Sequence, residues 1–216
     1  MADIRAVIFD FGGVFTTSPI ENFAVFERAN GLPERFLGEV IKTNHHTNSF
    51  ARFERAEIDL GRFDREFAEQ TGAAGFEVSG RELVSLLEVQ LKPDMARALE
   101  RVIGAGRKTG CITNNMPANA GTGMVAAEAQ GEVARLFALF DHVIQSSKAG
   151  VRKPEPIIYE MMCEALGVAP TQCVFIDDLG INLKPAKAMG MHTIKAPFGD
   201  AAPAIAELSR ILGVEL

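Results

Sequence analysis

Three short apolar runs in this chain of 216 residues each end in polar side chains of the kind that carry out chemistry. The first run ends in Asp10, the second in Thr113 and Asn114, and the third in Asp177 and Asp178. Short apolar runs between turn signals are typical of strands that are buried on both faces. In open α/β sheets, ligands bind outside the carboxyl ends of the strands. The sequence therefore predicts one sheet edge that collects these five side chains.

The order of helical and strand patterns predicts how that sheet is built. We expect five strands, at residues 4–9, 110–113, 142–145, 173–176 and 192–194. The later strands alternate with helical patterns, which are expected at residues 93–105, 124–139, 154–166, 185–189 and 201–212. Residues 115–123 are rich in Asn, Gly, Ala and Thr and are expected to form a loop. This alternation indicates an α/β fold with a doubly wound, parallel, five-stranded sheet.

The segment between the first strand and the rest of the sheet shows helical patterns and no strand pattern. Apolar residues recur there at helical spacing, and Asn30-Gly31 and Thr71-Gly72 are stop signals. We expect helices around residues 22–26 and at 33–41, 49–56, 59–70 and 79–90. The simplest arrangement is an α-helical cap, residues 18–90, inserted into a Rossmann-like core of residues 1–17 and 91–216.

Composition narrows the classes of function. A net charge of −6 and a pI near 5.3 provide no basic surface of the kind that nucleic acids require. No run of 18 apolar residues suggests a membrane span, and the N-terminal residues do not resemble a signal peptide. The three cysteines lie in apolar segments and are expected to be reduced core residues. We expect a cytoplasmic protein without a nucleic acid or membrane partner; the oligomeric state is not evident.

The clustered carboxylates favour a bound cation. Asp10, Asp177 and Asp178 would repel one another at one sheet edge unless a cation held them, and hard oxygen ligands suit Mg²⁺. Lys153 lies in the basic segment 148–154, between two strands that end in acids. A lysine there would balance the carboxylates and neutralise a bound phosphoryl group as a point charge.

Four motifs in this order resemble those of the haloacid dehalogenase-like hydrolase superfamily. They are Val-Ile-Phe-Asp10, Cys-Ile-Thr113-Asn114, Gly-Val-Arg-Lys153-Pro and Phe-Ile-Asp177-Asp178. The resemblance covers essentially the whole chain, and the helical insertion is similar to the α-helical cap of that superfamily. Residues 9–14 and 175–186 look most like the phosphatase-like N-terminal domains of soluble epoxide hydrolases and acyl-CoA dehydrogenase family members.

The resemblance implies catalytic roles for these residues. Asp10 would be the nucleophile and would form an aspartyl-phosphate, a recognised use of a carboxylate. Thr113 and Asn114 would hold the transferring phosphoryl oxygens, and Lys153 would stabilise the charge shared by Asp10 and the phosphoryl group. Catalysis of this kind depends mainly on positioning and electrostatic stabilisation.

The resemblance also implies a set of metal ligands. Asp10 and Asp178 would bind Mg²⁺ directly, and Asp177 would lie beside it and act through water. Phosphatases of this superfamily usually carry a second Asp two residues after the nucleophile, where this chain has Gly12. The backbone carbonyl of that residue also binds Mg²⁺, and a glycine retains this carbonyl.

The side chain that Gly12 lacks normally protonates the leaving oxygen and later activates water. Loss of a positioned acid or base typically costs on the order of 100- to 10,000-fold in rate. Three consequences are open. First, the substrate has a leaving group that needs little protonation. Second, the cap supplies the proton, and His45 and His46 are the candidates that would then contact the substrate. Third, the protein is a weak phosphatase.

The sequence as a whole predicts a Mg²⁺-dependent, phosphatase-like hydrolase that acts on a small phosphorylated metabolite. One alternative is a metal-independent haloacid dehalogenase. It is less favoured, because an uncompensated acid cluster would raise the pKa of the nucleophile and weaken it. A second alternative is a catalytically silent member that binds a phosphorylated ligand. The substrate itself is not evident from the sequence.

Overall fold

The computed structural model describes residues 3–116 and 130–216, in which parallel strands form one sheet. The strand order is β3-β2-β1-β4-β5. The strands are β1 (Ala6–Phe9), β2 (Lys108–Thr113), β3 (His142–Gln145), β4 (Cys173–Asp177) and β5 (His192–Lys195). The expected doubly wound, parallel, five-stranded sheet is confirmed.

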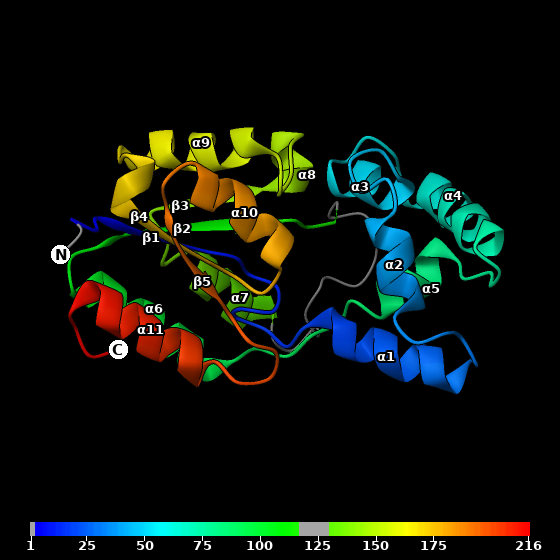
Figure 1. Cartoon of the computed structure of the whole chain (residues 1–216), viewed down its shortest axis with the longest axis horizontal. Coiled ribbons are helices and arrows are strands. Elements are labelled where there is room, and N and C mark those ends of the chain that lie inside the picture. Colours follow the sequence, from blue (N-terminus) through cyan, green and yellow to red (C-terminus); the bar gives the residue numbers. More distant parts are fainter. Residues whose placement is uncertain (1–2, 117–129) are drawn as a thin grey trace.

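Helices cover both faces of the sheet (Figure 1). One face carries α6 (Pro93–Gly104), α7 (Gln130–Phe137) and α11 (Ala202–Leu212), and the other carries α9 (Pro156–Leu166) and α10 (Gly180–Ala188). Within β1, Val7 and Phe9 pack toward the first face, whereas Ala6 and Ile8 pack toward the second. Burial on both faces is the reason that these strands have continuous apolar sequences.

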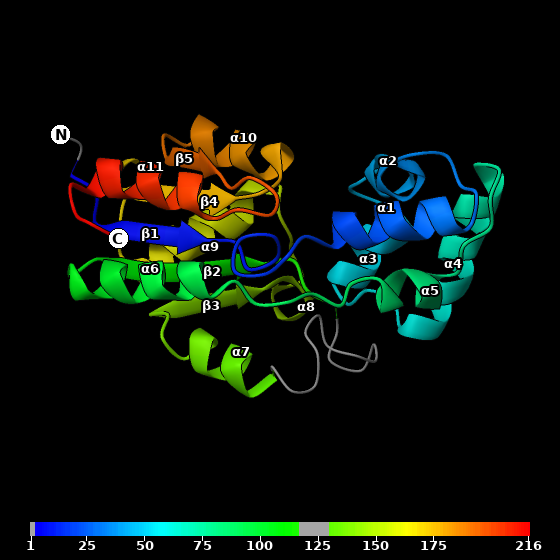
Figure 2. The ribbon, with the colours of Figure 1, turned by 90° about the horizontal axis from the view of Figure 1, so that it is seen from below.

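Five further helices lie together beyond the carboxyl ends of the strands (Figure 2). They are α1 (Pro19–Ala29), α2 (Phe36–Lys42), α3 (Ser49–Glu54), α4 (Leu60–Ala73) and α5 (Gly80–Ser85), which we call the cap. The cap has its own apolar cluster, in which the rings of Phe53 and Phe63 stack with their centroids 4.4 Å apart. Its packing is therefore separate from the two apolar layers that cover the sheet.

The cap is joined to the sheet by two segments that run side by side, Phe15–Thr17 and Gln90–Lys92, which we call the connecting ribbon. The amide of Thr17 donates to the carbonyl of Gln90 at 2.8 Å, and the amide of Lys92 donates to the carbonyl of Phe15 at 2.7 Å. Thr16 and Leu91 form an antiparallel bridge between these hydrogen bonds. The chain thus leaves and re-enters the core at one place.

Several expected element boundaries are wrong. The helix expected at 79–90 ends at Ser85, because the chain that follows must extend to enter the connecting ribbon. The helix expected at 185–189 begins at Gly180, because Asp177 accepts a hydrogen bond from the Leu179 amide and starts the helix before its proline.

Smaller differences occur elsewhere. Helices α2 and α9 begin two or three residues later than expected, and a short helix, α8 (Ser146–Ala149), follows β3 in the expected basic loop. Residues 117–129 lie outside the described residues, and with them most of the loop expected at 115–123 and the first part of the helix expected at 124–139.

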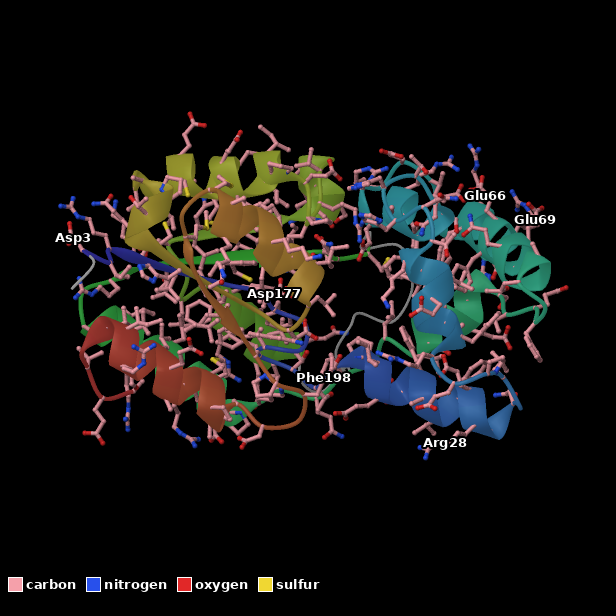
Figure 3. All side chains as sticks on the ribbon, in the orientation of Figure 1. Asp3, Arg28, Glu66, Glu69, Asp177 and Phe198 are labelled. Atoms are coloured by element: carbon pink, nitrogen blue, oxygen red, sulfur yellow. The ribbon has the colours of Figure 1, made fainter. Side chains whose placement is uncertain are left out.

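Buried charged side chains gather where the sheet faces the cap. In Figure 3, Asp177 lies in the interior, whereas Asp3, Arg28 and Glu69 lie at the periphery. Among residues 3–116 and 130–216, the buried charged residues are Asp10, Glu27, Glu54, Arg152, Lys153, Asp177 and Asp178, and of these only Glu27 belongs to the interior of the cap alone. None of the described helices is long and apolar enough to cross a membrane.

Candidate active site

The position of Asp10 follows from strand pairing. Its amide donates to the carbonyl of Ile176 at 2.8 Å, so the parallel pairing of β1 with β4 continues one residue beyond the end of β1. This register brings Asp10 beside Asp177, which ends β4. The sheet edge therefore holds the two carboxylates together, as the sequence predicts.

Lys153 links these two carboxylates. Its Nζ lies 2.6 Å from Oδ1 of Asp10 and 2.8 Å from Oδ2 of Asp177, and the side chain is 1% exposed. Burial alone would lower the pKa of Lys153, but the two carboxylates together raise it above its ordinary value. The lysine is therefore a fixed positive charge between a candidate nucleophile and a buried acid.

The backbone of Lys153 is held by Asn114. The Nδ2 of Asn114 donates to the Lys153 carbonyl at 2.9 Å, and the Lys153 amide donates to Oδ1 of Asn114 at 2.9 Å. Thr113 ends β2 and is buried. Among the described residues, Asn114 and not Thr113 lines the cavity above Asp10. The side chain of Asn114 thus positions the lysine, a role that strand-end spacing does not indicate.

Asp177 and Asp178 are adjacent but face different surroundings. Asp177 is fully buried, and its carboxylate accepts hydrogen bonds from Lys153, from the Leu179 amide at 2.8 Å and from Nδ2 of Asn182 at 3.0 and 3.1 Å. Asp178 lines the cavity, and its Oδ2 accepts a long hydrogen bond of 3.4 Å from Oγ of Ser18. Asp178 is therefore the member of the pair that is directed to a ligand.

The donor set fits a hard divalent cation. One oxygen from each of Asp10, Asp177 and Asp178 lies within 4.8 Å of the others. Burial raises the pKa of Asp10 well above its ordinary value, with Lys153 opposing this and the other two acids adding to it. Burial and then Asp177 raise the pKa of Asp178 to about 6. The three carboxylates have one lysine beside them, which contacts Asp10 and Asp177, so the cluster carries excess negative charge. Oxygen ligands with excess negative charge are those that Mg²⁺ prefers.

The turn after Asp10 depends on the absence of a side chain at Gly13. Gly13 has a φ of +74°, and a Cβ placed on it would lie 2.2 Å from Oδ2 of Asp178. Nζ of Lys92, in the connecting ribbon, donates to the Gly13 carbonyl at 2.9 Å. The neighbouring Gly12 lines the cavity. The two glycines thus allow the backbone to pass close to the carboxylates.

A cavity of about 280 Å³ lies between this sheet edge and the cap. Asp10, Asp178 and Lys153 are on its core side. Most of the remaining wall is apolar and comes from both parts of the chain: Pro19, Ile20, Phe23, Ile41, Phe50, Leu87, Met116, Leu179 and Ile181. The cavity therefore has a charged end at the strand ends and a mostly apolar wall, which also includes Lys42, His45, Glu54 and Arg152.

The two candidate histidines are placed differently. His45 is half-buried and lines the cavity, whereas His46 is exposed; the centroids of their rings are 3.9 Å apart. Burial, followed by the charges of His46 and Arg152, lowers the pKa of His45. His45 is thus the histidine that can reach a ligand in the cavity.

Sequence reasoning missed a buried ion pair in the same wall. Nε of Arg152 in the core lies 2.5 Å from Oε2 of Glu54 at the end of α3, and both residues line the cavity. Arg152 precedes Lys153, which could have drawn attention to it. No spacing pattern marks Glu54, because its position depends on how the cap folds against the core.

Comparison with known proteins gives a family match. The sequence model of the family described as haloacid dehalogenase-like hydrolase matches residues 4–190. Acyl-CoA dehydrogenase family member 10 of Mus musculus is 30% identical, and bifunctional epoxide hydrolase 2 of Sus scrofa is 31% identical. The alignments cover 98% and 99% of this chain but 19% and 40% of those proteins, so the chain spans less than half the length of either relative.

One relative of similar length is a phosphatase of Mycobacterium tuberculosis. It is 32% identical over 88% of this chain and 85% of its own length. Two solved structures share the fold. A predicted HAD-like hydrolase from Porphyromonas gingivalis has a TM-score of 0.64 at 21% identity, and the match covers 97% of this chain and 99% of that one. A HAD-family enzyme of Bacteroides thetaiotaomicron, solved with magnesium and inorganic phosphate, has a TM-score of 0.59 at 20% identity and covers 91% and 96%.

Gly13→Ala is expected to destabilise the protein. The change forces a side chain into a left-handed conformation and against the carboxylate of Asp178. We expect a loss of about 2 kcal/mol or more in the free energy of unfolding, measured by urea denaturation. Gly72→Ala is the matched control, since a Cβ on this helical glycine meets nothing within 4 Å and should leave stability equal or slightly higher. Equal stabilities of the two variants would contradict the packing described for Gly13.

Proposed function

Because the chain belongs to the haloacid dehalogenase-like hydrolase family, we propose that it hydrolyses phosphate monoesters with Asp10 as the nucleophile. The observation that carries this proposal is the contact of Asp10 with Lys153 at 2.6 Å, beside Asp178 at the charged end of the cavity. The phosphatase from Mycobacterium tuberculosis that matches most of the chain supports it.

Each core residue has a definite task in this proposal. Asp10 attacks the phosphorus atom and becomes an aspartyl-phosphate. Lys153 stabilises the negative charge that Asp10 and the phosphoryl oxygens share during transfer. Asp177 and Asn114 keep the lysine in place, through its ammonium group and its backbone respectively. A phosphoryl oxygen is bound by the backbone that follows β2, near Thr113 and Asn114.

We propose Mg²⁺ as the cofactor. Asp10, Asp178 and the carbonyl of Gly12 would hold it, with Asp177 behind them. When bound, the ion would neutralise charge on the phosphoryl oxygens. The pKa values of Asp10 and Asp178, raised by burial and by neighbouring acids, are those of a cluster that a cation would stabilise. The related fold solved with magnesium and inorganic phosphate supports this cofactor.

The organic part of the substrate is proposed to be largely apolar. The cavity wall beyond the charged end consists mostly of aliphatic and aromatic side chains such as Ile20, Phe23, Ile41 and Phe50. Burying apolar surface contributes about 25 cal/mol per Å², so an aliphatic chain gains affinity against this part of the wall, where a sugar hydroxyl would lose water without a partner. A phosphorylated alcohol with an aliphatic chain fits this wall.

Phosphate release from 4-nitrophenyl phosphate tests the reaction. We expect turnover with Mg²⁺, loss of turnover in EDTA and recovery when Mg²⁺ is restored. Asp10→Asn should reduce turnover to the background rate, because an amide is a poor nucleophile. Asp94→Asn makes the same chemical change at an exposed carboxylate and should leave turnover unchanged.

Other results of this test would reject parts of the proposal. Activity that is unaffected by EDTA would exclude the Mg²⁺ assignment. Release of chloride from a 2-chloro acid, with no phosphate release from any ester, would identify a dehalogenase. If neither reaction occurs while phosphate or Mg²⁺ raises the melting temperature, the protein binds a phosphorylated ligand without turning it over.

Alkyl phosphates of increasing chain length test the apolar wall. We expect kcat/KM to rise by about fourfold for each added methylene, since one buried methylene is worth about 0.8 kcal/mol, until the cavity is filled. Ile41→Asn should flatten this dependence, because the polar side chain interrupts the wall. A sugar phosphate that is turned over as well as the longest alkyl phosphate would contradict the proposed substrate class.

A further inference from the structure

One carboxylate in the cavity wall has no part in the proposed function so far. Among the described residues that line the cavity, the acids are Asp10, Asp178 and Glu54, and Glu54 is the one contributed by the cap. It is the last residue of α3 and is 5% exposed. A buried carboxylate that faces a candidate active site needs a structural or a chemical explanation.

Core residues fix the position of Glu54. Its Oε2 accepts a hydrogen bond from Nε of Arg152 at 2.5 Å, and its backbone carbonyl accepts one from Oγ of Ser146 at 2.8 Å. Arg152 also donates from a terminal nitrogen to the carbonyl of His45 at 2.8 Å. Because Arg152 precedes Lys153, the segment that presents the lysine to Asp10 also holds Glu54. The cap carboxylate is therefore positioned by the segment that carries Lys153.

The other carboxylate oxygen of Glu54 is available to a ligand. No hydrogen-bond donor to Oε1 occurs among residues 3–116 and 130–216. Oε1 is not fully buried. In that part of the chain, the fully buried side-chain nitrogen or oxygen without a hydrogen-bond partner is Nε of Arg107. Glu54 therefore lines the cavity and has one carboxylate oxygen that keeps accessible surface.

The surroundings of Glu54 suit a group that exchanges protons. Burial raises its pKa, while Arg152, Lys153 and Arg55 oppose the rise. Proton transfer is most efficient when the pKa of the acid lies near the working pH. A buried carboxyl with a raised pKa is closer to that condition than an exposed glutamate would be.

Resting on the proposed function, we propose that Glu54 is the general acid and base of the reaction and replaces the carboxylate that position 12 lacks. Gly12 and Glu54 both line the cavity, one from the core and the other from the cap. The cap would then complete the catalytic machinery as well as bind the organic part of the substrate.

The proton returns to Glu54 in each cycle. When Asp10 attacks phosphorus, the bond from phosphorus to the leaving oxygen breaks, and that oxygen takes the proton of the Glu54 carboxyl. A water oxygen then forms a bond to phosphorus, the Asp10 carboxylate leaves, and the proton of the water passes to Glu54. The products are an alcohol and inorganic phosphate, and both carboxyl groups end as they began.

Glu54→Gln separates this role from a structural one. The amide oxygen of Gln still accepts a hydrogen bond from Arg152, but the buried guanidinium loses its negative partner, so the melting temperature should fall and the kinetics are compared below it. We expect kcat/KM for an alkyl phosphate to fall by at least about 100-fold. For 4-nitrophenyl phosphate, whose leaving group needs little protonation, the loss should be below about 10-fold. The quantity kcat/KM is used because it reports the first transfer, to Asp10.

Two further variants sharpen the test. Adding Gly12→Asp to Glu54→Gln should restore at least a tenth of the lost alkyl phosphate turnover, since a core carboxylate would take over the proton. Gly12→Asp alone should raise alkyl phosphate turnover much less, because Glu54 already supplies the proton there, and an equal gain in both backgrounds would contradict the assignment. His45→Gln changes another proton-exchanging cap group in the wall and should not discriminate between the two leaving groups.

Several results would overturn the assignment. Equal losses for the alkyl and aryl phosphates in Glu54→Gln, or no loss for either, would show that Glu54 does not protonate the leaving group. A selective loss in His45→Gln alone would transfer the role to His45. A wild-type protein without phosphatase activity that depends on Asp10 would instead reject the proposed function itself, which separates the two failures.

Discussion

The ammonium group of Lys153, held between Asp10 and Asp177, is the interaction on which the rest of the site depends. A buried ammonium or carboxylate without a partner costs several kcal/mol, so the three groups must be brought together accurately. The register of β1 with β4 aligns the two acids, and Asn114 fixes the backbone of the lysine. The parallel sheet therefore acts as the scaffold of a charge arrangement that would be unfavourable if any member moved away.

The core and the cap contribute different chemistry to the cavity. The core supplies the carboxylates and the lysine from strand ends, where the backbone is rigid. The cap supplies apolar wall and one carboxylate, Glu54, from helices that pack around their own cluster. This division lets the wall that contacts the organic part of a substrate vary without disturbing the sheet edge. The same division makes a cap residue a reasonable source of a group that the core lacks at Gly12.

The sequence predicts the sheet and the core half of the site well, because strand patterns and strand-end residues are local properties. Asp10, Asp177 and Asp178 could be brought together on paper from the rule that parallel strands end at one edge. Contacts between distant segments could not be predicted in this way. Glu54 and Arg152 are 98 residues apart, and no spacing within either segment indicates that they meet. The start of α10 and the end of α5 were predicted wrongly for a similar reason. The hydrogen bond from the Leu179 amide to Asp177 starts α10 before its proline, and the pairing of the connecting ribbon ends α5 early.

The connecting ribbon has a mechanical consequence for the carboxylates. It carries the chain in both directions between the core and the cap. Lys92 of this ribbon also holds the carbonyl of Gly13, and Gly13 packs directly against Asp178. The connecting ribbon and the turn beside the carboxylates are therefore joined by a direct hydrogen bond. A displacement of this ribbon would be transmitted through the ammonium group of Lys92 to the turn that borders the charged end of the cavity.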